Sequence, residues 1–259
     1  MIKIRDLCKS FGKTSILQNL DLDIPDGETL VILGRSGVGK SVLLKHILGI
    51  TKPDSGYVEI DGARVSELNG AQLFQAISKM GMLFQGGALF DSMSLEENTG
   101  FHLKEHGNLE TGMPYSEAEI LVRVNESLAM VDLSGSNSKS PSELSGGMKK
   151  RAALARVIAY KPKIILYDEP TTGLDPITSA QINQLIRKTQ KELGATSIVV
   201  THDIASAYTV ADKLGLHKDG KILYVSEPEK FMQVDDDLIK AFQRLLPENR
   251  EQLRRNLNG

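Results

Sequence analysis

Several residue types are scarce in this sequence. Its 259 residues include no tryptophan, one cysteine and 5% aromatic residues. The lone Cys8 cannot form an intramolecular disulfide, which is typical of a protein from a reducing compartment. No apolar run approaches the roughly 18 residues of a spanning helix, and the charged first residues lack the apolar segment of a signal peptide. We therefore expect neither a membrane-spanning nor a secreted protein, while attachment to a membrane through a partner stays open.

An excess of one charge is also missing. The chain has 31 Lys and Arg against 33 Asp and Glu, a formal net charge of −2. This balance argues against a nucleic-acid partner held by bulk positive charge, although a local basic groove stays open. With 41% hydrophobic and 25% charged residues, the composition is that of a globular protein. The chain is long enough for a core that needs no disulfide or metal.

Short apolar runs predict the strands of a parallel sheet. They lie at 29–33, 80–84, 163–167 and 197–200, and helical patterns alternate with them at 41–48 and 176–193. Because continuous β-branched runs are typical of strands buried on both faces, we expect an α/β fold with right-handed crossovers. Residues 2–7, 16–24 and 57–65 are instead separated by turn signals such as Pro25-Asp26-Gly27, and these predict antiparallel hairpins.

Two segments have the apolar spacing of helices rather than strands. Residues 89–160 contain no strand-like run, and 116–131 has helical spacing, so we expect a helical insertion there. Near the C-terminus, residues 238–246 repeat the helical pattern, and a basic stretch with Arg250, Arg254 and Arg255 follows. This tail is interpreted either as a docking segment for another subunit or as a capping helix with a solvated basic end.

One segment matches the pattern G-x-x-x-x-G-K-[ST] in full. It consists of Gly34, Arg35, Ser36, Gly37, Val38, Gly39, Lys40 and Ser41. A predicted strand precedes it and a predicted helix follows, as in a phosphate-binding loop rather than a turn without a ligand. The glycines let backbone N–H groups close around phosphate oxygens, and the helix N-terminus adds partial positive charge. We expect Lys40 to reach the β- and γ-phosphates and the Ser41 hydroxyl to bind Mg²⁺.

Polar residues follow two of the other predicted strands. Asp168 ends one strand, where a carboxylate can bind Mg²⁺ directly or through water, and the next residue, Glu169, can polarise the water that attacks a γ-phosphate. His202 follows the strand at 197–200, at the edge of a parallel sheet where ligands bind. His202 could hold the γ-phosphate or orient Glu169, and the alternative is a capping or packed histidine.

A second anion cradle precedes another predicted helix. Leu144-Ser145-Gly146-Gly147-Met148 places a serine and two glycines before the helical run 149–160. One nucleotide needs only one phosphate loop, so a second cradle in the same chain is unexpected. It is explained if the cradle serves the nucleotide of another copy.

Together with Gln85, Gly173-Leu174-Asp175 and His202, these motifs resemble in order and spacing the ATPase subunit of ABC transporters, over about residues 1–230. The resemblance implies a P-loop NTPase fold. An α/β core of the RecA-like type with an antiparallel β subdomain would comprise 1–88 and 161–232. A helical subdomain with the signature motif would comprise 89–160, and a helical tail 233–259.

The resemblance also implies a role for each motif residue. The catalytic residues would be Glu169, His202, Lys40 and Gln85. ATP would be bound by Phe11, which stacks on adenine, by residues 34–41, and by Ser145, Gly146, Gly147 and Asp175. The Mg²⁺ ligands would be Ser41, Gln85 and Asp168. Alternatives remain for three of these residues, because Phe11 could belong to the core, Gln85 could be a polar strand-edge residue, and Asp175 before Pro176 is also a good helix N-cap.

Two short segments narrow the resemblance. Met148 replaces the commoner glutamine of the signature, and the runs 145–151 and 82–91 resemble the Mla/Mce-type ATPases. Members of that group energise phospholipid or other lipid transport between bacterial membranes. This implies hydrolysis of ATP, with Mg²⁺, by a homodimer on the cytoplasmic face of the inner membrane.

The expected partners are permease subunits, a membrane-anchored MCE-domain lipid-binding protein and a small STAS-type regulator, and no nucleic acid. Residues 86–94 could form the permease contact or could be subdomain core. Two alternative functions stay open, an importer ATPase for a small solute and a soluble ABC ATPase of iron–sulfur cluster assembly.

Overall fold

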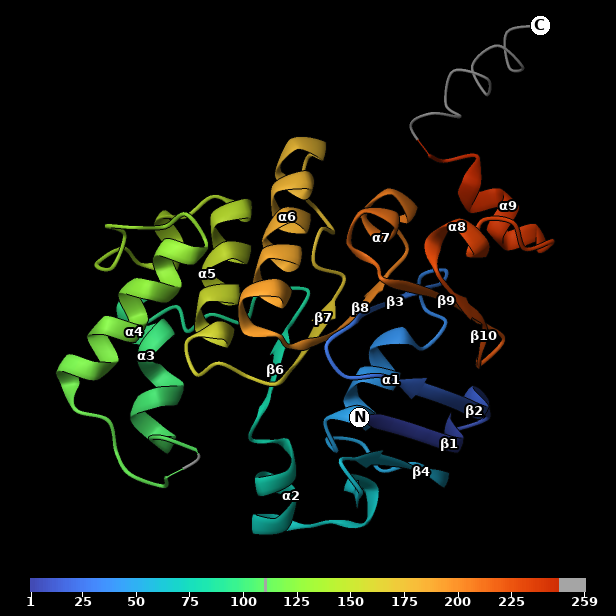
Figure 1. Ribbon diagram of the computed structural model, residues 1–259, viewed down its shortest axis with the longest axis horizontal. Coiled ribbons are helices and arrows are strands. Elements are labelled where there is room, and N and C mark those ends of the chain that lie inside the picture. The colour runs from blue at the N-terminus through green and yellow to red at the C-terminus, as the bar shows by residue number, and fades with distance from the viewer. Residues whose placement is uncertain (110, 247–259) are drawn as a thin grey trace, which may run out of the picture. The chain divides into compact units, whose positions relative to one another are not determined.

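The computed structural model (Figure 1) describes residues 1–109 and 111–246. The chain divides into two compact units. Unit 1 contains Met1–Leu73 and Ile198–Gly259, and unit 2 contains Phe74–Ser197. Strand β8 (Thr196–Thr201) and helix α2 (Gly70–Ile77) each include residues of both units. Residues 247–259 of the predicted tail lie outside the described residues. The finer subdomain boundaries inferred from the resemblance stay a prediction.

An antiparallel sheet forms the first layer of unit 1. Its strands are β1 (Ile2–Phe11), β2 (Thr14–Ile24), β4 (Ser55–Ile60) and β5 (Ala63–Arg64), in the order β2-β1-β4-β5. Ile2, Ile4 and Leu7 of β1 are fully buried, and a register shift between Ile4 and Leu7 interrupts the simple alternation of faces along the strand. The predicted antiparallel pairing of this part of the chain is therefore confirmed. The turn signal at Pro25-Asp26-Gly27 forms no hairpin, because it leads from β2 to β3 (Thr29–Leu33) of the second sheet, and β1 and β2 are joined at residues 12–13 instead.

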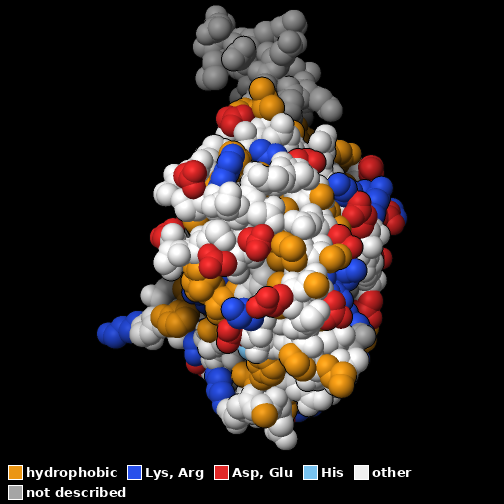
Figure 2. Space-filling view, turned by 90° about the vertical axis from the view of Figure 1, so that its left-hand side faces the viewer, with side chains coloured by type: hydrophobic (Ala, Val, Ile, Leu, Met, Phe, Trp, Pro, Cys, Tyr) orange, Lys and Arg blue, Asp and Glu red, His pale blue; other side chains and the backbone are white. Residues whose placement is uncertain are grey.

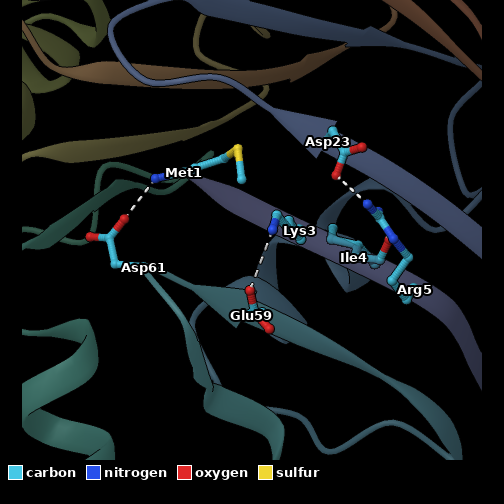
Figure 3. Close-up of polar contacts among 7 residues, drawn as sticks. All are labelled: Met1, Lys3, Ile4, Arg5, Asp23, Glu59 and Asp61. Atoms are coloured by element: carbon cyan, nitrogen blue, oxygen red, sulfur yellow. Dashed lines mark hydrogen bonds and ion pairs between the residues drawn. The ribbon is translucent and has the colours of Figure 1, made fainter.

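Charged groups form ion pairs between the strands of this sheet and their flanking residues (Figure 3). The Met1 ammonium donates to Asp61 at 2.6 Å, Lys3 lies 3.9 Å from Glu59, and Arg5 contacts Asp23 at 2.7 Å. Lys3 and Glu59 are direct cross-strand partners. Opposite charges at such positions favour the observed register, although exposed pairs add little free energy.

The second sheet of unit 1 contains the strand order β10-β9-β3-β8. Strand β3 (Thr29–Leu33) is buried along its whole length, and it pairs in parallel with β9 (Lys213–Lys218). Strand β10 (Lys221–Ser226) is antiparallel to β9. The helices are α1 (Lys40–Ile47), α7 (Ile204–Val210), α8 (Pro228–Phe231) and α9 (Asp237–Gln243), with the short 3₁₀ turn η1 (Val65–Glu67).

Unit 2 combines two parallel strands with four helices. Strand β6 (Met80–Leu83) pairs in parallel register with β7 (Ile164–Asp168). The helices are α3 (Leu95–His106), α4 (Glu117–Met130), α5 (Gly146–Ile158) and α6 (Pro176–Leu193), with the 3₁₀ turn η2 (Pro141–Glu143). Between residues 89 and 160 the described part of the chain forms helices and turns without a strand, which confirms the predicted helical character of this region.

The α/β prediction is confirmed, and several elements differ from it in detail. Helix α5 begins at Gly146 rather than at 149, because the Ser145 side chain caps it. Strands β9 and β10 were missed, since Gly215 and His217 interrupt the apolar pattern of β9, which lysines bound at both ends. The Asp219-Gly220 pair between them is the sequence signal of a tight hairpin turn, and in the structure both residues have positive φ, of 51° and 75°.

The surface carries both signs of charge. Lys and Arg side chains are interspersed with Asp and Glu on the face shown in Figure 2. This mixture agrees with the near-neutral composition. Among the described residues, we find no helix that is both long and apolar enough to cross a membrane.

Candidate nucleotide-binding site

The phosphate loop connects strand β3 to helix α1 in unit 1. At Gly39, where φ is 105°, a Cβ atom would lie 2.5 Å from Cγ2 of Ile16. At Gly34, a Cβ atom would lie 2.8 Å from the carbonyl oxygen of His217. Only glycine fits both positions, so the local packing requires the residue type that also allows close approach of a phosphate.

Lys40 lies over this loop. Its side chain is 4% exposed, and Nζ donates to the carbonyl oxygens of Gly34 at 2.9 Å and Arg35 at 3.0 Å. Ser41 is half-buried in the first turn of α1. An ammonium group, the N-terminus of a helix and a glycine-rich backbone therefore meet in one short segment, which is the arrangement that binds phosphate groups.

A buried histidine lies against the first residue of the phosphate loop. His217 of β9 is fully buried, and burial, with the Lys40 charge as the second cause, lowers its pKa to about 4. It is therefore neutral near pH 7 and adds no charge beneath the phosphate loop. Sequence reasoning missed this residue, because a histidine within an interrupted apolar run carries no signal of its place in the fold.

Two further predicted residues lie in unit 1. His202 is exposed directly after β8, and the carbonyl of the preceding residue, Thr201, accepts a hydrogen bond from the Gly34 N–H at 3.3 Å. Strand β8 thus brings the backbone before His202 to the start of the phosphate loop. Phe11 is 53% exposed at the end of β1, with Lys9 Nζ 5.6 Å from its ring centroid. The alternative that Phe11 belongs to the core is therefore wrong.

The acidic pair ends strand β7 in unit 2. Asp168 and Glu169 are 7% and 8% exposed. Glu169 has a φ of 48°, and Thr172 Oγ1 donates to its Oε2 at 3.1 Å. A left-handed backbone at a residue other than glycine costs about 1 kcal/mol, so the surrounding turn must hold it there. The sequence gives no sign of this strained geometry.

Lys150, which sequence reasoning also missed, lies near this acidic pair. It is 6% exposed, and it donates to the carbonyl of Gln85, the residue that follows β6 and Phe84. Burial lowers its pKa, while the charges of Asp168 and Glu169 act in the opposite direction. Unit 2 therefore groups Gln85, the acidic pair and a buried cation.

The second cradle begins helix α5. Ser145 Oγ accepts a hydrogen bond from the Met148 N–H at 3.3 Å, so this serine is the N-cap of the helix. A Cβ atom at Gly147 would lie 2.4 Å from Cγ2 of Thr178 in helix α6. Close packing of α5 on α6 therefore requires glycine at this position, in addition to any role in binding an anion.

Asp175 caps helix α6, as its position before Pro176 predicts. Its Oδ1 accepts hydrogen bonds from the N–H groups of Ile177 and Thr178, each at 3.0 Å. The Thr178 hydroxyl and these N–H groups lower the pKa of the carboxyl. The capping interpretation is confirmed, and the interface role of Asp175 stays a prediction.

Comparisons with known proteins identify the family of the chain. The family model described as ABC transporter matches residues 17–172. The probable ribonucleotide transport ATP-binding protein mkl of Mycobacterium leprae (strain TN) is 41% identical over 93% of this chain and 68% of its own length. The intermembrane phospholipid transport system ATP-binding protein MlaF of Haemophilus influenzae (strain ATCC 51907 / DSM 11121 / KW20 / Rd) is 39% identical over 93% of this chain and 89% of its own.

A solved structure gives the same result at the level of the fold. A dimeric ATP-binding cassette in a post-hydrolysis state, bound to ADP and Pi, matches with a TM-score of 0.78 and 34% identity, and the match covers 88% of this chain and 99% of that one. The expected P-loop NTPase fold is thereby confirmed. With the phosphate loop, the signature motif and the acidic pair in place, this chain belongs to the ABC transporter family and is one of its ATP-binding, ATP-hydrolysing subunits.

Proposed function

We propose that this chain drives phospholipid transport between bacterial membranes, as an ATPase subunit of the Mla/Mce type. The observation that carries the proposal is its similarity to MlaF, which extends over 93% of this chain and 89% of that protein. The signature with Met148 and the basic run after it support the same assignment. The phosphate loop, whose glycines the packing requires, supplies the nucleotide chemistry.

In this proposal nucleotide binding and activation of the attacking water are carried out by different groups. In unit 1, Lys40 and the loop N–H groups bind the phosphates, Phe11 stacks on adenine and His202 holds the γ-phosphate. In unit 2, Glu169 polarises the attacking water, because a buried carboxylate held by Thr172 is an oriented proton acceptor.

Mg²⁺ would be held by Ser41, Asp168 and Gln85. These residues fit the ion, since a hydroxyl, a carboxylate and an amide oxygen are the hard donors that it prefers. When bound, Mg²⁺ neutralises charge on the phosphate oxygens. The protein's own contribution is the placement of these donors, with Asp168 fixed by its position as the last residue of β7.

A second copy completes the site. We infer that Ser145 and the N–H groups at Gly146 and Gly147 bind the γ-phosphate held by the phosphate loop of the other copy, with Asp175 at the interface. Donors from both copies would then stabilise the charge that develops during phosphoryl transfer. ATP thereby favours the closed dimer, and hydrolysis releases it, which makes the dimer a two-state element.

The dimer proposal is tested with Glu169→Gln. This variant should bind ATP normally, hydrolyse it at least about 100-fold more slowly and remain an ATP-bound dimer on size-exclusion chromatography. Ser145→Ala in one copy of a mixed dimer should inactivate the site of the other copy. Near-normal turnover of Glu169→Gln would remove Glu169 as the catalytic carboxylate, and a defect confined to the mutated copy would contradict sharing of the site.

The remaining partners belong to the membrane. We propose permease subunits that contact residues 86–94, an MCE-domain lipid-binding protein and a STAS-type regulator, on the cytoplasmic face of the inner membrane. Phe90 within that segment packs on Phe101, with ring centroids 4.8 Å apart, and it supports the fold of unit 2. The more exposed residues of the segment, such as Gly86 and Ala88, are available for a partner.

Transport is tested by purification of the tagged chain from membranes and reconstitution of the complex in vesicles. A permease and an MCE-domain protein should co-purify, and ATP should drive transfer of a labelled phospholipid, which Glu169→Gln abolishes. Uptake of a solute such as a ribonucleotide, the cargo in the name of the mycobacterial relative, would instead support a small-solute importer. Recovery of iron–sulfur assembly proteins without a permease would support the alternative function, a soluble ABC ATPase of iron–sulfur cluster assembly.

A further inference from the structure

Helix α5 holds the segment 85–90, which follows strand β6, along one of its faces. Lys150, Ala153 and Arg156 are spaced three residues apart, so they lie on one side of the helix. Lys150 donates to the carbonyl of Gln85. This contact joins two residues that are 65 positions apart in the sequence.

The rest of the segment is held by the same helix face. Arg156 donates to the carbonyl of Ala88 at 2.6 Å, and its guanidinium lies 4.4 Å from the ring centroid of Phe90. Between these contacts, a Cβ atom at Gly87 would lie 3.5 Å from Cβ of Ala153. The backbone from Gln85 to Phe90 therefore follows the surface of α5 closely.

A lysine is an unusual residue for this packing. Lys150 is 6% exposed, and burial of an unpaired ammonium costs several kcal/mol. Its compensation comes from the Gln85 carbonyl and from the charges of Asp168 and Glu169, which favour its protonated form. The adjacent Lys149 is exposed. An apolar side chain would pack at position 150 without this desolvation cost. The charged hydrogen-bond donor of Lys150 therefore points to a use in the reaction.

We propose that Lys150 is a positioning residue for ATP hydrolysis, which fixes the backbone of Gln85 relative to Asp168 and Glu169. This proposal rests on the proposed roles of Gln85 and the acidic pair. Because the signature motif begins the same helix, a displacement of Ser145 is transmitted through α5 to Gln85. The N-cap at Ser145 and the lysine are five residues apart, less than two helical turns.

The experiment measures steady-state ATP hydrolysis by the full chain. Lys150→Met should lower kcat about tenfold and leave the KM for ATP within about twofold, because the lost contact positions a catalytic group and does not bind the nucleotide. Lys150→Arg, which keeps a charged donor, should restore most of the rate. Lys149→Met is the matched control, and it should keep kcat within about twofold. An unchanged kcat in Lys150→Met, or an increase in KM without a decrease in kcat, would overturn the proposal.

A double-mutant cycle separates positioning from a general structural effect. If Lys150 acts through Gln85, Lys150→Met should slow Gln85→Ala by less than about twofold, although it slows the native chain about tenfold. Equal slowing in both backgrounds would overturn the proposal even if Lys150→Met folds less stably. Glu169→Gln is assayed in parallel to distinguish failure of the Lys150 proposal from failure of the proposed catalytic site. Normal turnover of Glu169→Gln would refute the catalytic site itself.

Discussion

The Asn98 side chain forms hydrogen bonds with both backbone polar groups of Phe90. Its Oδ1 accepts from the Phe90 N–H at 2.8 Å, and its Nδ2 donates to the Phe90 carbonyl at 3.1 Å. The same Nδ2 also donates to the carbonyls of Met93 and Ser94. Asn98 is fully buried, so these backbone groups depend on it in place of water. Helix α3 thereby fixes the Phe90 end of the segment 85–90, which helix α5 contacts along its length.

Asn98→Ala should therefore lower the free energy of unfolding by about 3 kcal/mol. The substitution leaves the Phe90 N–H and carbonyl without their buried partner, and each unsatisfied group costs about 1–3 kcal/mol. Urea denaturation measures the loss. Asn125→Ala removes an exposed contact with Asn137 and should change the free energy by less than about 0.5 kcal/mol. Equal effects of the two substitutions would contradict the assignment of stability to Asn98.

Gly39→Ala should weaken ATP binding at least about tenfold, because the new Cβ would lie 2.5 Å from Ile16 in a backbone with φ of 105° and would displace the phosphate loop. Titration calorimetry measures the affinity. Gly135→Ala is the matched control, since Gly135 has a φ of 72° with open space around it. That substitution should lower stability and leave ATP affinity unchanged. An ATP affinity of Gly39→Ala equal to that of the native chain would contradict the prediction that the new Cβ atom displaces the phosphate loop.

Much of the fold could be predicted from the sequence, because its signals are local. The antiparallel strands β1 and β2, the buried strand β3 and the long helix α6 all follow from apolar periodicity and capping residues. For strands β9 and β10 only the Asp219-Gly220 turn is a local signal, and the strands themselves could not be read in the same way. They follow from pairing with β3 and with each other, and such pairing is not encoded in one short window.

The candidate site shows the same division. The phosphate loop and the acidic pair are contiguous motifs, so the sequence identified them. Lys150 and His217 act through residues distant in sequence, Gln85 and Gly34, and only the folded chain brings them together. The requirement for glycine at 147 likewise depends on Thr178 in another helix. Sequence reasoning therefore found the chemical groups and missed the residues that support them.

His102 should make stability fall in mild acid. Burial lowers its pKa to about 4, below the ordinary value of 6.5. Between these values the unfolded chain binds a proton that the folded chain does not, so the free energy of unfolding decreases as the pH falls, by up to about 1.4 kcal/mol per pH unit. His102→Phe should reduce this slope and keep the stacking on Tyr160, whose ring centroid is 3.9 Å away. Denaturant titrations at pH 7, 6 and 5 measure the slope, and an identical slope in the variant would exclude His102.

Asp175 allows capping to be separated from dimer formation. Its carboxylate caps α6 through the N–H groups of Ile177 and Thr178. Asparagine caps helices about as well as aspartate, whereas alanine does not. Asp175→Asn should therefore keep the melting temperature, and Asp175→Ala should lower it. In a Glu169→Gln background, size-exclusion chromatography with ATP measures the dimer. If the carboxylate acts at the interface, Asp175→Asn should weaken the dimer at unchanged melting temperature, and if Asp175 acts only as a cap, this variant should form the dimer as the parent does.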